Sequence, residues 1–242
     1  MSRMNETAAI GFARSAEAYE RGRPEYPAAA LEPLGPGPGT TVLDLAAGTG
    51  KLTRALVASG ATVTAVEPVA EMRAALPKEA EALDGTAEEI PVPGASFDLV
   101  TVAQAFHWFD GDAALAEIHR VLRPDGRLAV VWNRRADDDP VNRAIREIVE
   151  PHRGGTPTHR GDGWRAAFER TPLFGPLEKR VFENDQVLDE DGLAARIHSI
   201  SFIASLPEPE RAEVLSRARE LTASGPVTVR HRTEVHLCVK QS

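Results

Sequence analysis

Cysteine is almost absent from this 242-residue chain, long apolar stretches are missing, and basic residues are fewer than acidic ones. The single cysteine, Cys238, cannot form a disulfide within the chain, which points to a reducing compartment, and we expect the cytoplasm. No stretch approaches the roughly 18 consecutive apolar residues of a membrane-spanning helix. The opening segment 1–11 is polar and lacks the apolar stretch of a secretory signal. The sequence therefore predicts no membrane partner.

Basic residues are also fewer than acidic residues. Lys and Arg number 28 against 36 for Asp and Glu, so the formal net charge is −8. Proteins that bind nucleic acid usually present a basic surface, and this balance argues against a nucleic-acid partner. Hydrophobic residues make up 42% of the chain, which is ordinary for a folded globular protein and excludes disorder of the whole chain.

From residue 40 onward, patterns typical of strands alternate with patterns typical of helices. Short apolar runs rich in β-branched residues indicate buried strands, and amphipathic stretches with helical spacing lie between them. This alternation predicts an α/β fold with a doubly wound, mostly parallel sheet, to which an antiparallel C-terminal strand and further helices are added. The expected strands are 41–45, 61–66, 81–85, 97–103, 127–133, 177–187 and 227–239, and the expected helices are 52–58, 68–76, 110–122, 141–150, 193–203 and 208–223.

A glycine-rich turn follows the first expected strand and opens the first helix. Gly48 and Gly50 allow a sharp turn and a close approach of a ligand to the backbone, and the free N–H groups of the helix start can donate to that ligand. Glu67 ends the second strand, where a carboxylate can accept hydrogen bonds from both hydroxyls of a ribose. A dinucleotide fingerprint needs glycine where Thr53 stands. A phosphate-binding P-loop needs glycine where Leu45 stands, so both readings are weaker.

Several segments in the right order resemble motifs of class I S-adenosylmethionine-dependent methyltransferases. The turn 44–50 resembles their first motif, 96–100 their fourth-strand motif, and 117–126 the helix and turn before their fifth strand. The resemblance spans about residues 40–133 and implies a Rossmann-like methyltransferase fold. It also implies an enzyme that transfers a methyl group from S-adenosylmethionine to a small organic acceptor.

A narrower resemblance points to a small-molecule branch. Segments 19–27, 85–89 and 105–110 are similar to those of trans-aconitate methyltransferases. The resemblance implies one domain whose parts have different tasks. Residues 1–39 would form an N-terminal lid, 40–135 the cofactor-binding core, 136–226 a variable substrate side, and 227–242 the final strand.

The resemblance also implies which residues hold the cofactor. Glu67 would bind the ribose hydroxyls, Pro68 would flank the adenine, and Thr86 stands where many relatives have an aspartate that accepts from the adenine amino group. Asp44 and the backbone that follows it would hold the methionine end and the ribose. The implied cofactor-binding residues are Tyr19, Arg23, Asp44, Ala46, Gly48, Gly50, Glu67, Pro68, Thr86, Ala87, Gln104 and Ala105.

The acceptor atom stays open among oxygen, nitrogen and carbon, and the expectation is a carboxylate or hydroxyl oxygen. A hydroxyl acceptor needs a general base, and His107 is the candidate because it follows the fourth strand and titrates near neutral pH. A carboxylate acceptor needs no base but needs cationic anchors. The other histidines show no metal-ligand spacing, so no metal is expected. The candidate substrate residues are Arg21, Trp108, Asn133 and Arg134.

Two alternatives remain on the sequence alone. One is a noncatalytic module that keeps a cofactor pocket, because methyl transfer needs few obligatory side chains. The other is a nucleotide-dependent oxidoreductase on a similar sheet, against which the missing third glycine argues. The sequence favours the methyltransferase, acting as a monomer or a homodimer on a small-molecule acceptor.

Overall fold

A seven-stranded sheet forms the centre of the protein. The computed structural model describes residues 20–155 and 162–242, so the candidate Tyr19 lies outside the described residues. The strand order is β3-β2-β1-β4-β5-β9-β6. Strands β1 to β5 are parallel, and β9 runs antiparallel to both β5 and β6, which confirms the predicted fold class. The strands are β1 (Thr41–Leu45), β2 (Thr62–Val66), β3 (Glu81–Leu83), β4 (Phe97–Ala103), β5 (Leu122–Arg135), β6 (Glu178–Glu183) and β9 (His231–Val239).

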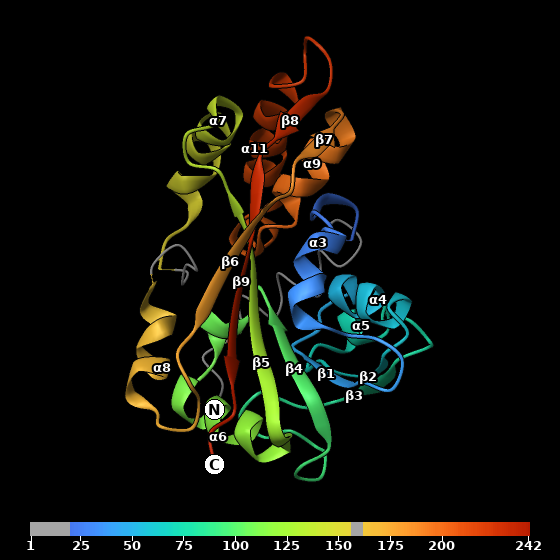
Figure 1. Cartoon of the computed structure of the whole chain (residues 1–242). Helices are drawn as coiled ribbons and strands as arrows, with labels where there is room; N and C mark the ends of the chain where they lie inside the picture. The colour runs from blue at the N-terminus through green and yellow to red at the C-terminus, as the bar shows by residue number, and fades with distance from the viewer. Residues whose placement is uncertain (1–19, 156–161) are drawn as a thin grey trace.

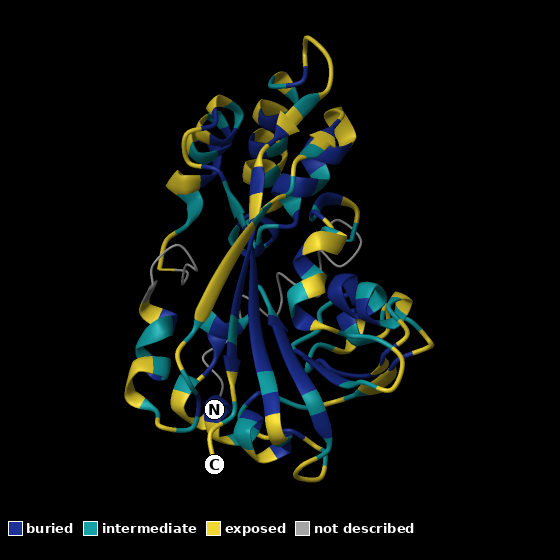
Figure 2. Ribbon diagram, in the orientation of Figure 1, coloured by how far each residue is buried: buried dark blue, intermediate teal, exposed yellow. Residues whose placement is uncertain are grey.

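Each face of the sheet buries its own apolar core. On one face, α3 (Ala28–Leu31) and α4 (Lys51–Ala58) cover β1, β2 and β4. On the other face, α6 (Gly111–Val121) and α8 (Ala166–Arg170) cover β4 and β5. Figure 2 shows β4, β5 and β9 dark blue over most of their length, whereas the edge strand β6 is exposed. The two faces together account for the near-continuous apolar runs of the central strands.

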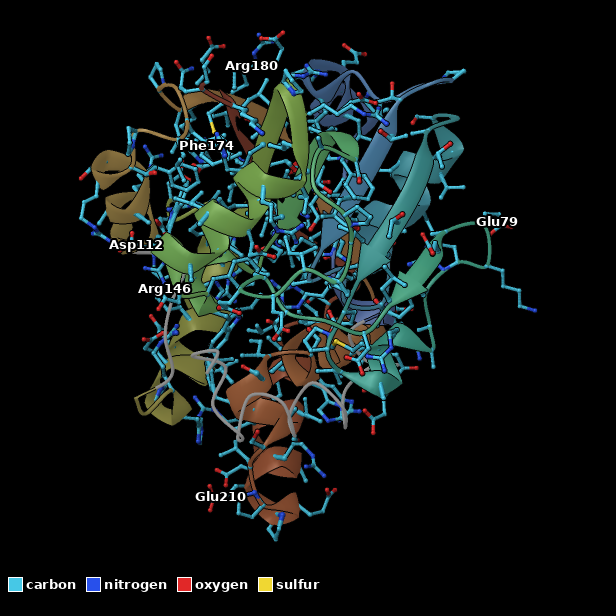
Figure 3. The ribbon with its side chains drawn as sticks, turned by 90° about the horizontal axis from the view of Figure 1, so that it is seen from below. Glu79, Asp112, Arg146, Phe174, Arg180 and Glu210 are labelled. Atoms are coloured by element: carbon cyan, nitrogen blue, oxygen red, sulfur yellow. The ribbon has the colours of Figure 1, made fainter. Side chains whose placement is uncertain are left out.

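A third core lies above the sheet, in a cap. The long strands β5 and β9 lead up into it (Figure 1). Figure 3 shows Glu210 at the outer end of the cap, on α11, far from the sheet. The cap consists of α7 (Pro140–Val149), β7 (Gln186–Leu188), α9 (Glu190–His198), α10 (Ser201–Ala204), α11 (Glu208–Glu220) and β8 (Val227–Val229).

The two expected strands at the C-terminal end are wrong as continuous elements. Each divides into a sheet strand and a short cap strand, and β7 pairs with β8 in a separate two-stranded sheet. The break between β8 and β9 has a local cause. The carbonyl oxygen of Arg230 accepts hydrogen bonds from the Ala136 backbone N–H at 3.0 Å and from Asn142 Nδ2 at 2.7 Å. These contacts turn the chain from the sheet into the cap.

Most of the remaining differences concern where elements begin and end. Strand β5 starts at Leu122, which pairs with Phe97 across a register shift. The expected helix 68–76 shortens to α5 (Ala70–Arg73). Asp189 caps α9 by accepting from the Gly192 N–H at 2.7 Å, so this helix begins before the expected residue 193. Among the described residues, no helix has both the length and the apolar character needed to cross a membrane.

Candidate cofactor and acceptor site

The site is built where the sheet order reverses, at the carboxyl ends of β1 and β4. Parallel α/β sheets bind ligands in the crevice at this switch point. Ala46 follows β1 with a φ of 54°, and Gln104 follows β4 with a φ of 63°. Both residues occupy the left-handed region without being glycine, which costs of order 1–3 kcal/mol each and is typical of functional sites. Two adjacent strand ends therefore hold strained backbone around one crevice.

The glycines of the turn are required by its geometry. Gly48 has a φ of 60° and Gly50 a φ of 85°, conformations that side chains rarely adopt. A Cβ on Gly50 would also lie 2.9 Å from Pro77 Cδ and 3.0 Å from Leu76 Cδ2. The turn thus packs against the residues that follow α5, and Gly48 remains beside the crevice.

The first pocket, of about 830 Å³, lies on the β2 side of this crevice. It brings together eight of the predicted residues from four separate loops. Its floor is apolar, with Leu45, Met72 and Phe109 among the lining side chains. The predicted residues that line it are Ala46, Gly48, Glu67, Pro68, Thr86, Ala87, Gln104 and Ala105, and the predicted substrate residue Trp108 lines it as well.

Glu67 is the buried acid of the first pocket. Its Oε2 accepts from the Gly48 N–H at 2.8 Å, and its Oε1 accepts from the Val69 N–H at 2.9 Å. Burial raises the pKa of Glu67, and the two backbone donors oppose that rise. Because each carboxylate oxygen has a further lone pair, Glu67 can order the glycine turn and still accept hydrogen bonds from a ligand.

Asp44 lies buried beneath the glycine turn, and its predicted role in holding the cofactor stays a prediction. Its side chain is 1% exposed, and among the described residues it lines neither pocket of this crevice. Its carboxylate accepts from Thr53 Oγ1 at 2.6 Å and from Thr101 Oγ1 at 2.8 Å. Asp44 therefore joins β1 to α4 and β4 beneath the turn. Burial raises its pKa to about 6, although both threonine hydroxyls lower it.

The pKa of Asp44 makes stability depend on pH. The folded protein holds this proton more tightly than the unfolded chain, whose ordinary value is 3.8. The contribution of Asp44 to stability is therefore greatest below pH 3.8 and falls as pH rises through 6, by about 3 kcal/mol in all, of which about 2 kcal/mol falls between pH 4.5 and 7.5. We expect urea unfolding of Asp44→Asn to lack this part of the slope. Parallel curves for the variant and the wild type would contradict the assignment.

The second pocket, of about 480 Å³, opens on the other side of the glycine turn. It shares Ala46, Gly48, Ala103 and Gln104 with the first pocket, so the two pockets adjoin at these residues as the two parts of the crevice. The predicted residues Arg23 and Asn133 line it. Tyr26, from the segment predicted to form a lid, lines it as well, and sequence reasoning missed Lys51 and Arg196 as lining residues.

The signals for these missed residues differ. Lys51 directly follows the glycine turn, so its place in the sequence could have indicated that it lies near the ligand. Arg196 lies on α9 within a stretch that carries no motif, so only the packing of the cap brings it to the crevice.

A strap, defined as residues 20–27, crosses from the glycine turn to the cap. Thr49 Oγ1 donates to Glu20 Oε2 at 2.8 Å, Arg54 pairs with Glu20, and Lys51 pairs with Glu25. Although burial opposes the effect, these donors and cations lower the pKa of Glu20. The strap is thus attached by charged groups to the helix that follows the turn.

The other end of the strap is attached to α9. Arg23 Nε donates to Ser199 Oγ and Arg23 Nη2 to the Ser199 carbonyl, both at 2.9 Å. Gln186 Nε2 donates to the Gly22 carbonyl at 3.2 Å. A Cβ on Gly22 would lie 2.4 Å from the Arg196 backbone nitrogen, so the strap backbone packs directly on the α9 backbone.

His107 lies beside the crevice in an aromatic wall. Its ring is 4.6 Å from that of Trp108 and 5.5 Å from that of Trp132, centroid to centroid. In the described chain it lines a separate hollow with Phe106 and Trp164, and neither of the two pockets. Burial, together with the charge of Arg23, lowers the pKa of His107 to about 4. The imidazole is therefore neutral at pH 7 and weakly basic.

Two predicted substrate residues lie away from both pockets in the described structure. Arg21 is 60% exposed and pairs with Asp191 at 3.6 Å on the surface of the cap. Arg134 pairs with Glu234 of β9 at 3.1 Å. Asn133 lines the second pocket, but its Oδ1 already accepts from Thr233 Oγ1 at 2.6 Å. The roles in substrate binding that the sequence predicts for Arg21, Arg134 and Asn133 stay predictions.

Comparison with known proteins identifies the class. Residues 43–130 match the family described as a methyltransferase domain. An uncharacterised methyltransferase of Mycobacterium tuberculosis is 41% identical over 221 residues, covering 90% of this chain and 87% of that protein. The solved structure of a candidate type II methyltransferase from Anaeromyxobacter dehalogenans has a TM-score of 0.68 at 24% identity, over 90% of this chain and 97% of that one.

A further solved structure has a bound cofactor product. A phosphoethanolamine N-methyltransferase of Haemonchus contortus, in complex with S-adenosylhomocysteine, has a TM-score of 0.53 at 18% identity, over 88% of this chain and 52% of that one. The present chain belongs to the methyltransferase family. It is an enzyme that uses S-adenosylmethionine as its methyl donor, which confirms the predicted class and cofactor.

Proposed function

We propose that this enzyme methylates a carboxylate or hydroxyl oxygen of a small organic molecule. The observation that carries this proposal is the two-part crevice around the glycine turn. Its first part has an apolar floor and a buried acid, which suit an adenosine, and its second part carries cationic side chains, which suit acidic groups.

The cofactor residues follow from this arrangement. Glu67 would accept from the ribose hydroxyls, and Pro68, Thr86 and Ala87 would line the adenine. Arg23 would face the methionine carboxylate from the second pocket. The N-terminal strap would act as a lid over this end of the cofactor, and the cap would supply the acceptor side.

Of the two acceptor groups, a carboxylate is better supported than a hydroxyl. In-line transfer from a sulfonium methyl depends chiefly on proximity and orientation. An ionised carboxylate needs no base, whereas a hydroxyl does. Since burial and Arg23 hold the pKa of His107 near 4, this histidine is a poor base for an alcohol. The resemblance to trans-aconitate methyltransferases also supports an acid as acceptor.

A labelled-methyl assay tests the proposal. The wild type is incubated with S-adenosylmethionine and a panel of carboxylic acids and alcohols, and the product is treated with alkali. A methyl ester releases methanol under these conditions and a methyl ether does not, so we expect volatile label. His107→Asn should keep the rate within tenfold and leave the pH profile flat from 6 to 8. An alkali-stable product, together with a loss of 10²-fold or more in His107→Asn, would instead identify His107 as the base for a hydroxyl.

A further inference from the structure

The first pocket carries charge of one sign. Of the described residues that line it, Glu67 and Glu88 are the charged ones, and both are acidic. The two acids come from different loops, since Glu67 directly follows β2 and Glu88 lies beyond the end of β3. An ionised carboxylate accepts hydrogen bonds and donates none. The pocket therefore suits a ligand that presents N–H or O–H donors to both loops.

Glu88 lies on a loop that helix α6 holds in place. Just beyond Glu88, the Ile90 N–H donates to Glu117 Oε2 at 3.0 Å. Arg120 donates to the carbonyl oxygens of Ile90 and Val92, both at 2.9 Å. Glu117 and Arg120 both belong to α6. The helix therefore fixes the backbone that presents Glu88 to the pocket.

The carboxylate of Glu88 is itself oriented. Its Oε1 accepts from the Asp110 N–H at 2.9 Å, and the preceding residue, Phe109, lines the same pocket. This hydrogen bond joins the loop after β3 to the segment after β4. Because a carboxylate has a second oxygen with lone pairs of its own, Glu88 can hold the Asp110 N–H and still accept from a ligand.

The adenosine of the cofactor has hydrogen-bond donors at two places. Its ribose carries two hydroxyls, and its adenine carries one amino group, on C6. With Glu67 at the ribose hydroxyls, the amino group is the donor that a second acid would meet. Thr86 also lines the pocket, but its hydroxyl is neutral. Hydrogen bonds to an ionised acceptor are about twice as strong as those between neutral groups, so Glu88 is the better partner for the amino group.

We infer that Glu88 accepts a hydrogen bond from the adenine amino group and thereby selects a cofactor with a 6-aminopurine over one with a 6-oxopurine. An oxopurine would place its own acceptor oxygen against the carboxylate and leave both groups without a donor. The inference rests on the proposed function, because it assumes that Glu67 binds the ribose and that the adenine fills the first pocket. It adds the residue that recognises the base.

Calorimetry with three ligands tests this inference. They are S-adenosylhomocysteine, its deaminated form S-inosylhomocysteine, and the purine analogue in which hydrogen replaces the amino group. The purine analogue only lacks the donor, whereas the inosine form presents an acceptor instead. A site that hydrogen-bonds a substrate N–H rejects an analogue without it. We expect the wild type to bind the purine analogue at least tenfold, and S-inosylhomocysteine at least 100-fold, more weakly than S-adenosylhomocysteine.

Glu88→Gln should shift this preference toward the oxopurine. The glutamine side chain has the same shape, and its oxygen can keep the hydrogen bond from the Asp110 N–H. Its amide nitrogen then takes the place of Oε2 and donates where the carboxylate accepted. We expect the affinity for S-adenosylhomocysteine to fall at least tenfold and that for S-inosylhomocysteine to rise. The ratio of the two affinities should therefore fall more than tenfold.

Two variants of neighbouring residues separate this contact from other effects. Glu89 is exposed and, in the described structure, does not line the first pocket. Glu89→Gln removes the same charge one residue away and should change none of the three affinities by more than twofold. Thr86→Val removes the neutral hydroxyl of the loop. It should weaken the three ligands to a similar extent, so that their ratios stay within twofold of the wild type.

Three results would overturn the inference. The first is a wild type that binds S-adenosylhomocysteine and its purine analogue with affinities within twofold of each other. The second is a Glu88→Gln variant with the same affinity ratios as the wild type. The third is a preference for the amino group that Thr86→Val abolishes, which would assign that group to Thr86. Failure of the wild type to bind S-adenosylhomocysteine would instead count against the proposed function.

Discussion

Replacing Glu67 by alanine is expected to weaken S-adenosylhomocysteine binding at least 100-fold. The substitution removes the two oxygens that we propose accept from the ribose hydroxyls, and hydrogen bonds to a charged group contribute about 1.5–3 kcal/mol each. It also removes the partners of the Gly48 and Val69 N–H groups, so the glycine turn loses its support. We expect the free energy of unfolding to fall by about 2 kcal/mol as a result. Calorimetric titration and urea unfolding measure the two effects separately.

A neighbouring acid provides the control for this experiment. Glu71 lies exposed in the first turn of α5, close in sequence to Glu67. Glu71→Ala removes the same charge without touching the turn, and its Kd should stay within twofold of the wild type. Equal affinity in Glu67→Ala and Glu71→Ala would remove Glu67 from the cofactor site.

The second large effect is expected from Gly22→Ala. The added Cβ would lie 2.4 Å from the Arg196 nitrogen and 2.5 Å from the Ala195 carbonyl carbon, and backbone atoms of a helix cannot yield as a flexible side chain does. The strap must therefore lift from α9, which removes the contacts of Arg23 with Ser199. We expect at least tenfold weaker S-adenosylhomocysteine binding. Overpacking of this kind costs about 1–3 kcal/mol, so Tm should fall by about 5 °C.

Gly37→Ala is the matched substitution. A Cβ at Gly37 would meet nothing within 4 Å, and the backbone there does not have a positive φ. Its Tm and Kd should equal those of the wild type. If Gly22→Ala behaves in the same way, the strap does not need its close contact with α9 in order to hold the cofactor.

The sheet and the glycine turn were predictable because their signals are local. Strand β4 has the expected bounds, and the helix after the turn starts within one residue of its expected position. Short β-branched runs and a strand–glycine–helix order carry their structure with them. Asp110, the first residue of the expected helix 110–122, caps α6 by accepting from the Ala113 N–H at 3.4 Å.

What the sequence did not predict depends on contacts between distant segments. Nothing near Arg196 indicates that α9 will fold back over the crevice, or that residue 22 must be a glycine to pass beneath it. Asp44 shows the same limit for a residue that does belong to a motif. Its motif position predicts a ligand contact, which stays a prediction. The hydrogen bonds of its carboxylate with Thr53 and Thr101, which join three elements, do not follow from the motif. Motifs identify which residues matter, and only packing determines which atoms face the ligand.

The separate apolar core of the cap has a consequence for how such an enzyme can diversify. Side chains of α7, α9 and α11 pack mainly on one another and on β8, and not on the two faces of the sheet. Mutations there can accumulate without disturbing the strands that carry the cofactor loops, since substitutions at sites without shared contacts have nearly independent effects. One sheet can therefore be inherited intact across descendants while the sequence of the cap changes.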